Sequence, residues 1–186
     1  MVFSPGASGF TVTSNPSLHF MGAGITNNAG VPQNFVGNSL AASPTEFFNS
    51  ANAGNANNNF TITGWLEFAD TATAGSATYL NSDNLVFKAT STAGTGTFVN
   101  NGNMFIDDSA TMANANVTNN SSIYFAEKSS AGTGVITCNG ATTAGGAFGR
   151  VCLRPTQRRT MRRLSLTRAQ MVATEGASVF SDAPMD

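Results

Sequence analysis

Charged residues are scarce in this chain. Of its 186 residues, 10% are Asp, Glu, Lys or Arg, and the formal net charge is −1. Disordered chains usually combine low hydrophobicity with high net charge. This chain has 41% hydrophobic residues and almost no net charge, so it has neither property. Its length suits one domain with a core of its own. The composition therefore predicts a single folded unit.

Cysteine and long apolar runs are also scarce. The two cysteines, Cys138 and Cys152, have no spacing typical of a zinc or redox site. No run approaches the ~20 apolar residues of a membrane helix, so no membrane insertion by this segment is predicted. The first ten residues, MVFSPGASGF, lack the basic start and apolar centre of a signal peptide. If the protein is exported, we expect this chain to be an internal piece of a longer one.

Basic residues are distributed unevenly. Residues 1–149 contain two of them, Lys88 and Lys128, against seven acidic residues, whereas residues 150–186 contain seven arginines. Two interpretations of this tail stay open: a basic arm for nucleic acid or an anionic surface, and a change of coding frame after the repeats. The stretch RPTQRRTMRR has no interleaved aromatic residues and matches no nucleic-acid-binding module, so no nucleic-acid partner is predicted. We expect residues 150–186 to be disordered or out of frame, without native function.

What the chain does contain is a repeated phrase. FADTATAGSATYLN at residues 68–81 returns as FKATSTAGTGTFVN at 87–100 and as FAEKSSAGTGVITC at 125–138. Steps of 21, 19, 19 and 19 residues separate the anchors Phe47, Phe68, Phe87, Ile106 and Phe125. Two residues before the last four anchors stands another apolar residue, and this alternation predicts a short strand with one buried face.

Each repeat continues with a corner and a second strand. Seven residues after the anchors comes a column of small residues, Gly54, Gly75, Gly94, Ala113 and Gly132. Glycine tolerates positive φ, so this column predicts a corner. Eleven residues after the anchors comes a second apolar column, Tyr79, Phe98, Val117 and Ile136, which Phe60 joins if the first repeat is two residues longer. A polar column closes each unit at Asn81, Asn100, Asn119 and Cys138, with Asn139 beside the last.

These columns predict an all-β fold, the parallel β-helix or β-solenoid. One repeat cannot bury its apolar side chains alone, but stacked copies form ladders of like side chains ~4.8 Å apart. We expect about five 19-residue rungs and an irregular N-terminal rung within residues 17–149. Residues 1–16 are expected as an N-terminal edge segment, and the C-terminal tail is expected to be irregular. Phenylalanine is expected to stack inside, and Thr and Asn rows are expected to pair at the surface or corners.

The repeated phrase, F-x-x-[ST]-[AT]-x-A-G-x-[AG]-x-Φ-x-N, resembles the passenger region of bacterial autotransporter-type surface proteins, which are extracellular right-handed parallel β-helices. The stretch SLHFMGAGITNNAGVPQNFV at 17–36 is similar to an irregular passenger rung. The resemblance implies a fragment of a secreted or surface-anchored protein, extracellular or at the cell surface, and associated with the outer membrane in the full-length parent. The family's C-terminal barrel is not found in the sequence. Because the motifs are structural, no active residue carries over.

The sequence predicts no catalytic residue, metal site or cofactor. Asp107 and Asp108 are an adjacent acidic pair, but neighbours on a strand point to opposite faces, so we expect a solvated corner. His19 is expected on the outward side of an edge strand, without a catalytic partner. Lys88 and Lys128 are expected to be single exposed charges.

Two further features have structural interpretations. Trp65 is expected to pack beside Leu66. The GTG stretches at 94–96 and 132–134 lack the remaining residues of a phosphate-binding loop and a following helix.

The function expected from these observations is a non-catalytic structural and adhesive segment rather than an enzyme. A stiff rod would present polar faces or loops to a host or cell-surface glycan or protein, with the insertion at 28–45 as the contact loop. The alternative is a fragment of a carbohydrate-active β-helix, a lyase or hydrolase, whose active rung is missing. An ice-binding face would need T-x-T rows, and TVT at 11–13 and TIT at 61–63 are not expected to recur in phase. Exposed strand edges predict end-to-end self-association.

Overall fold

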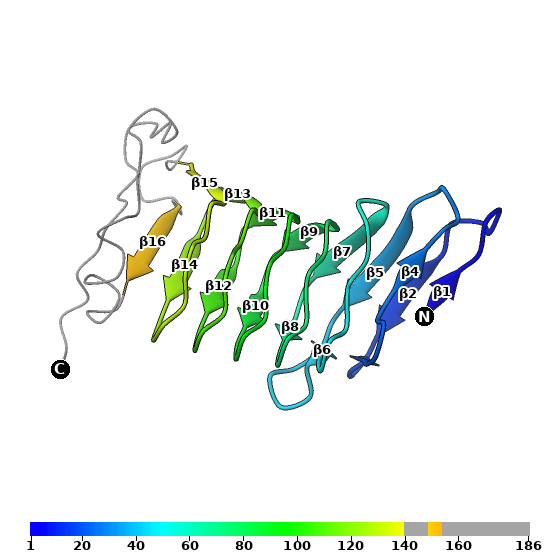
Figure 1. Ribbon diagram of the computed structural model, residues 1–186, viewed down its shortest axis with the longest axis horizontal. Coiled ribbons are helices and arrows are strands. Elements are labelled where there is room, and N and C mark those ends of the chain that lie inside the picture. Colours follow the sequence, from blue (N-terminus) through cyan, green and yellow to red (C-terminus); the bar gives the residue numbers. More distant parts are fainter. Residues whose placement is uncertain (140–148, 154–186) are drawn as a thin grey trace.

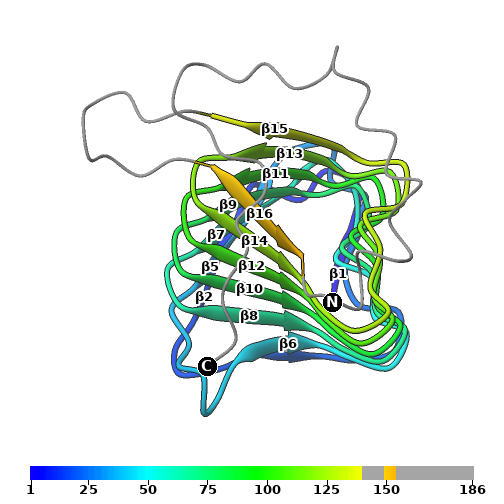
Figure 2. The same cartoon turned by 90° about the vertical axis from the view of Figure 1, so that its left-hand side faces the viewer.

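The described residues, 1–139 and 149–153 of the computed structural model, form a parallel β-solenoid of about seven turns, each of roughly 19 residues. Sixteen strands, and no helix, occur in this part of the chain. The coils stack into a rod with the N-terminus at one end (Figure 1), and the view along the rod shows that each coil has three sides (Figure 2). The predicted fold class is confirmed.

Two sides of each coil are seven-stranded parallel sheets. Sheet I consists of β2 (Thr11–Ser14), β5 (Gln33–Gly37), β7 (Asn58–Ile62), β9 (Thr78–Asn81), β11 (Thr97–Asn100), β13 (Asn116–Asn119) and β15 (Val135–Cys138). Sheet II consists of β3 (His19–Phe20), β6 (Thr45–Phe47), β8 (Trp65–Phe68), β10 (Asn84–Phe87), β12 (Asn103–Ile106), β14 (Ser122–Phe125) and β16 (Arg150–Leu153). The strands of the two sheets alternate along the chain, so every coil contributes one strand to each.

The third side is narrower. Single-residue parallel bridges join Gly24, Asn52, Thr73, Thr92, Thr111 and Ser130 in that order. At the N-terminal end, β1 (Val2–Phe3) pairs with β4 (Thr26–Asn27). Backbone hydrogen bonds therefore run along the rod on all three sides.

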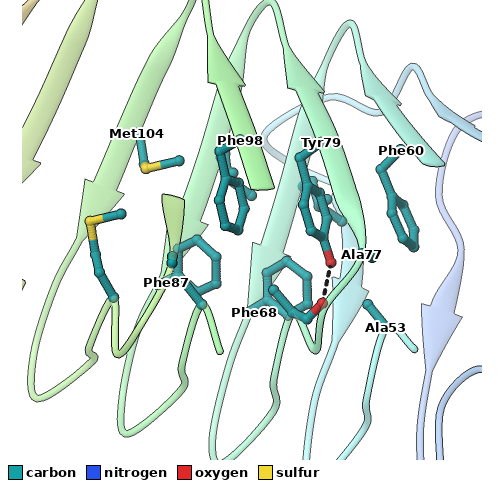
Figure 3. Packing of buried hydrophobic residues seen from close by; sticks show 14 of the residues in the cluster. Ala53, Phe60, Phe68, Ala77, Tyr79, Phe87, Phe98 and Met104 are labelled. Atoms are coloured by element: carbon teal, nitrogen blue, oxygen red, sulfur yellow. Dashed lines mark hydrogen bonds between the residues drawn. The ribbon is translucent and has the colours of Figure 1, made fainter. Parts of the chain in front are cut away.

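The predicted aromatic columns face each other in the interior. On sheet II, the Phe68 ring stacks on Phe47 and on Phe87, with centroids 4.9 Å apart in both pairs. On sheet I, the Tyr79 ring stacks on Phe60 at 4.9 Å and on Phe98 at 4.6 Å. The two rows meet edge to face, for example Phe68 and Tyr79 at 6.1 Å (Figure 3). All six rings are almost completely buried, so the rows form the core.

Tyr79 shows how a polar group is accommodated in this core. Its hydroxyl donates a 2.8 Å hydrogen bond to the carbonyl of Ala74 (Figure 3), and its burial raises the pKa of the phenol well above the ordinary value. One rung has Ile106 and Val117 in the anchor and second columns instead of aromatic residues. In that rung the residue directly before the corner position is Met112, whereas the other rungs have a buried alanine there. A larger side chain in the small column thus compensates for smaller ones in the aromatic columns.

The asparagine column lies at the corner between the sheets, with its side chains turned inward and fully buried. Asn81 Nδ2 donates to Asn100 Oδ1 at 2.7 Å, and Asn100 Nδ2 donates to Asn119 Oδ1 at 2.8 Å. Each Nδ2 also reaches a sheet II carbonyl, as Asn100 does at Ser122 O (3.0 Å). At the last rung Asn119 meets the Cys138 thiol at 3.7 Å, and burial raises the pKa of that thiol. This asparagine ladder ties the two sheets together.

The corners depend on positive φ angles. The predicted small column adopts them at Gly54, Gly75, Gly94 and Gly132, and also at Ala113 (φ 49°). A second positive-φ column, not predicted, lies two residues after each anchor, at Asn49, Asp70, Ala89, Asp108 and Glu127. Asn and Asp enter this region more easily than most residues, so the column carried a weak sequence signal.

The rod extends beyond both predicted boundaries. β2 lies within residues 1–16 yet pairs with β5, and β16 lies within 150–186 yet pairs with β14, in register from Ser122 opposite Arg150. Phe125 and its register partner Leu153 are 28 residues apart instead of 19, so the period is interrupted in the sequence before β16. Residues 154–186 of the predicted tail lie outside the described part.

Candidate functional site

The outer face of sheet II carries ionisable side chains from four consecutive coils. His19 lies opposite Glu46 in the strand register, and Glu46 lies opposite Glu67. The His19 Nδ1 is 3.8 Å from Glu46 Oε2, and Lys88, which directly follows β10, forms an ion pair with Glu67 Oε1. We call these four residues the charged row. The prediction that Lys88 is a single exposed charge is wrong.

The two carboxyl groups of the charged row are partly shielded from water. The side chain of Glu46 is 21% exposed and that of Glu67 is 11% exposed. Burial, followed by the charge and hydrogen bond of Glu67, raises the pKa of Glu46 against the opposing effect of Lys88 and His19. The hydrogen bond with Glu67 raises the pKa of Lys88. The lysine therefore offsets part of the repulsion between two neighbouring carboxylates.

Farther along the same face the column becomes apolar and aromatic. Val86, Phe105 and Tyr124 continue the column that contains Glu46 and Glu67. The rings of Phe105 and Tyr124 stack at a centroid distance of 5.0 Å, and both side chains are half-buried. An exposed aromatic pair on a sheet can contact the flat face of a sugar ring or an apolar protein side chain.

Trp65 and a short loop lie at the start of β8. Trp65 is half-buried, and its Nε1 is shielded from water without a hydrogen-bond partner among the described residues. Its backbone N–H donates to Ser39 O at 2.7 Å, which places it beside the loop at 38–44 between β5 and β6. That loop projects from the rod (Figure 1) and exposes 72% of Leu40.

The predicted contact insertion at 28–45 is shorter than expected. Its central residues, Gln33–Gly37, form β5, which pairs with β2 and β7 inside sheet I. Only the loop at 38–44 leaves the coil, and a bridge between Leu40 and Ser43 closes it. The sequence does not mark β5 clearly, because Phe35 is its one large apolar residue and the turn residues Asn28 and Gly30 precede it. The turn and the strand were therefore predicted to form one loop.

The other predicted positions have structural roles. His19 is outward on β3, the edge strand of sheet II, as predicted. Asp107 and Asp108 lie at a corner as predicted, although they follow β12 instead of belonging to a strand. Asp108 has φ 53° and accepts a 2.8 Å hydrogen bond from Ala89 N–H, so its carboxylate stabilises the preceding rung's corner. Lys128 is exposed.

The GTG stretches serve close packing between coils. A Cβ on Gly94 would lie 2.4 Å from Gly75 O, and one on Gly96 would lie 2.8 Å from the Phe98 ring. A Cβ on Gly132 or Gly134 would likewise collide with the backbone of the preceding rung. These four positions therefore leave no room for a side chain.

TVT at 11–13 and TIT at 61–63 do not lie in phase, as predicted, because Thr11 and Thr13 are in register with Asn59 and Thr61. Other rows of hydroxyl residues do recur in phase, on the third side of the rod. TAT at 71–73, TST at 90–92 and SAT at 109–111 lie in register through the bridges of that side. Their hydroxyls are engaged with the backbone: Thr90 Oγ1 donates to Asp70 O at 2.9 Å, and Thr92 Oγ1 accepts from Gly94 N–H at 3.1 Å. These hydrogen bonds stabilise the corners.

Within residues 1–139 and 149–153, no three His, Cys, Asp or Glu side chains are grouped so that they could hold a metal ion. No helix in this part could cross a membrane. Comparison of the chain with protein-family models, with curated proteins and with solved structures gives no match.

Proposed function

We propose that this protein is a non-catalytic structural and adhesive rod, a segment of a secreted or surface-anchored bacterial protein of the passenger type. The observation that carries the proposal is the continuous stacked core, in which aromatic rows and the asparagine ladder join consecutive coils. A core of this kind makes the rod stiff along its axis, as a spacer at a cell surface requires. The extracellular or cell-surface location belongs to the same proposal and rests on the resemblance of the repeats.

The proposed contact surface is the outer face of sheet II with the loop at 38–44. It combines an exposed leucine, a half-buried tryptophan, the charged row and the aromatic pair Phe105–Tyr124. Aromatic residues are enriched in contacts between proteins, and an exposed ring can also contact the face of a sugar. The partner we propose is a glycan or protein of a host or cell surface.

Adhesion of the full-length chain to cultured epithelial cells and to immobilised mucin tests this proposal. We expect saturable binding that Tyr124→Ala and Leu40→Ala weaken and that Leu80→Ala, an exposed leucine on the opposite sheet, leaves unchanged. The proposal would be contradicted if all three variants bound cells and mucin equally well, or if the folded protein bound neither.

A carbohydrate-active β-helix is the second candidate, and the charged row favours it. Glu46 and Glu67 are neighbouring carboxyl groups, one of them with a raised pKa, and glycoside cleavage commonly uses two carboxyl groups. Against this, Lys88 occupies Glu67 through an ion pair. Incubation of the chain with pectin, alginate and xylan, followed by assays for reducing ends and unsaturated products, separates the candidates. Turnover that Glu46→Gln abolishes would favour the enzyme.

End-to-end self-association is a further part of the proposal. Both sheets have edge strands at each end, and exposed large apolar residues gather near the N-terminal end, namely Met1, Val2, Phe10, Met21 and Val31. Residues 1–45 contain no Asp, Glu, Lys or Arg, so charge repulsion does not oppose contact between copies there. We expect concentration-dependent oligomers in sedimentation velocity, reduced by Phe10→Glu. A monomer over a wide concentration range would contradict this.

A further inference from the structure

The outer face of sheet I carries no charged side chain, whereas the outer face of sheet II carries Glu46, Glu67 and Lys88. The seven strands of sheet I present fourteen outward residues in two columns. One column is Thr11, Asn34, Asn59, Thr78, Thr97, Asn116 and Val135, and the other is Thr13, Val36, Thr61, Leu80, Val99, Thr118 and Thr137. All fourteen are at least partly exposed.

The threonine hydroxyls of this face are available to solvent. Seven of the fourteen residues are threonine, and no side-chain hydrogen bond within the described part of the chain engages any of these seven hydroxyls. On the third side, by contrast, Thr71 and Thr90 donate to backbone carbonyls. The sheet I hydroxyls must therefore form their hydrogen bonds with water or with a ligand.

The groups on this face are regularly spaced and rigid. Neighbouring strands are ~4.8 Å apart, and residues i and i+2 of one strand are about 6.6–6.8 Å apart. Ten of the fourteen residues are Thr or Val, whose β-branched side chains have few accessible χ1 rotamers. The face is therefore a two-dimensional array made mainly of fixed hydroxyl and methyl groups, with three asparagines and one leucine among them.

We propose that the outer face of sheet I binds ice. Its two spacings are close to oxygen repeats on the low-index planes of hexagonal ice, so its hydroxyls can occupy or anchor lattice positions while the methyl groups lie against ordered water. A charged group would oppose this, because it holds its own hydration shell strongly. A T-x-T pattern does not mark this face in the sequence, because asparagine, valine and leucine share its columns with threonine.

The chemistry of the face argues against a glycan as its occupant. It has no aromatic residue on which a sugar ring could stack, and no carboxylate or cation to bind a charged sugar. The aromatic and charged groups lie on sheet II instead, so the ice-binding proposal is independent of the adhesive one. Each can fail without affecting the other.

The test is whether the full chain enters growing ice. Fluorescently labelled protein is partitioned between a slowly grown ice layer and the remaining liquid, and inhibition of ice recrystallisation is measured on unlabelled protein. We expect the protein to enter the ice and to inhibit recrystallisation, and Thr97→Lys to abolish both effects. Thr90→Lys, the same substitution at an exposed threonine on the third side, is the matched control and should retain both.

Folding of each variant is checked by its far-ultraviolet circular dichroism and thermal unfolding. If Thr97→Lys does not fold, Thr78→Lys and Asn116→Lys place the charge one rung away in the same column. Exclusion of the folded protein from ice, or equal loss of activity in Thr97→Lys and Thr90→Lys, would overturn the proposal. Pelleting with microcrystalline cellulose that Thr97→Lys abolishes, without ice activity, would overturn it too and assign the face to a flat polysaccharide.

Discussion

The asparagine ladder provides the sharpest test of how the coils are joined. Asn100 is fully buried and takes part in three side-chain hydrogen bonds: it accepts one from Asn81 and donates to Asn119 and to Ser122 O. Replacing it with alanine removes all three bonds and leaves the Asn119 and Ser122 acceptors each without one donor. At about 1 kcal/mol for each bond, we expect Asn100→Ala to lower the free energy of unfolding by about 3 kcal/mol.

The adjacent residue is a matched control. Asn101 is exposed and also belongs to an asparagine row, because its Oδ1 accepts a 2.7 Å hydrogen bond from Asn120 Nδ2. Its amide can exchange that bond for one with water, so Asn101→Ala should change stability by no more than about 0.5 kcal/mol. Urea unfolding followed by circular dichroism measures both values, with the m-value checked for constancy. Equal costs for the two substitutions would refute the inward ladder as a stabilising element.

Three further predictions concern the core, the end of the ladder and the charged row. Cys138→Asn should extend the ladder by one rung and raise the free energy of unfolding by about 1 kcal/mol. Cys138→Ser, the control, should not raise it. A lower free energy of unfolding for Cys138→Asn would show that this rung cannot accommodate the amide. Phe68→Ala should cost about 3–5 kcal/mol in the same urea assay, since the ring is completely buried between two others, and a cost under about 1 kcal/mol would contradict the stacking. Because the folded state raises the pKa of Glu46, it binds that proton more tightly than the unfolded state, so this group's contribution to stability falls as pH rises above its ordinary pKa of 4.5. Glu46→Gln should therefore flatten the stability–pH curve between pH 4.5 and neutrality, and an unchanged curve would contradict the pairing with Glu67.

The fold could be predicted because a large apolar residue shows which side of a strand faces the interior. Phe68 and Phe87 recur with one period, and only an inward orientation buries them, so the period alone fixes the stacking. Asn100 carries no such information, because an asparagine is equally suited to a surface row or, when paired, to a buried one. Its inward orientation follows from its place directly after the buried Phe98 and the outward Val99, which the alternation of a strand requires.

The charged row belongs to a regular outward column of the repeat. Glu46 and Glu67 each stand one residue before an anchor, and Phe105 and Tyr124 share that column. This outward column changes from acidic to apolar and aromatic residues along the rod, so no constant residue type marks it in the sequence. The register between His19 and Glu46 is not evident from the period, because 27 residues separate them instead of 19. The strand at Arg150–Leu153 was not found for a similar reason, since extra residues precede it.

The most direct test of the account measures distance against the number of coils. Thr13, Thr61 and Thr137 lie in one outward column of sheet I. Thr61 is four rung steps from Thr137, and Thr13 is six rung steps from it. Pairs of spin labels at these positions, in a background with Cys138 and Cys152 replaced by serine, can be measured by double electron–electron resonance. The account predicts narrow distributions whose centres differ by about 10 Å, two rungs of ~4.8 Å. Broad distributions, or centres that follow sequence separation instead of rung number, would contradict it.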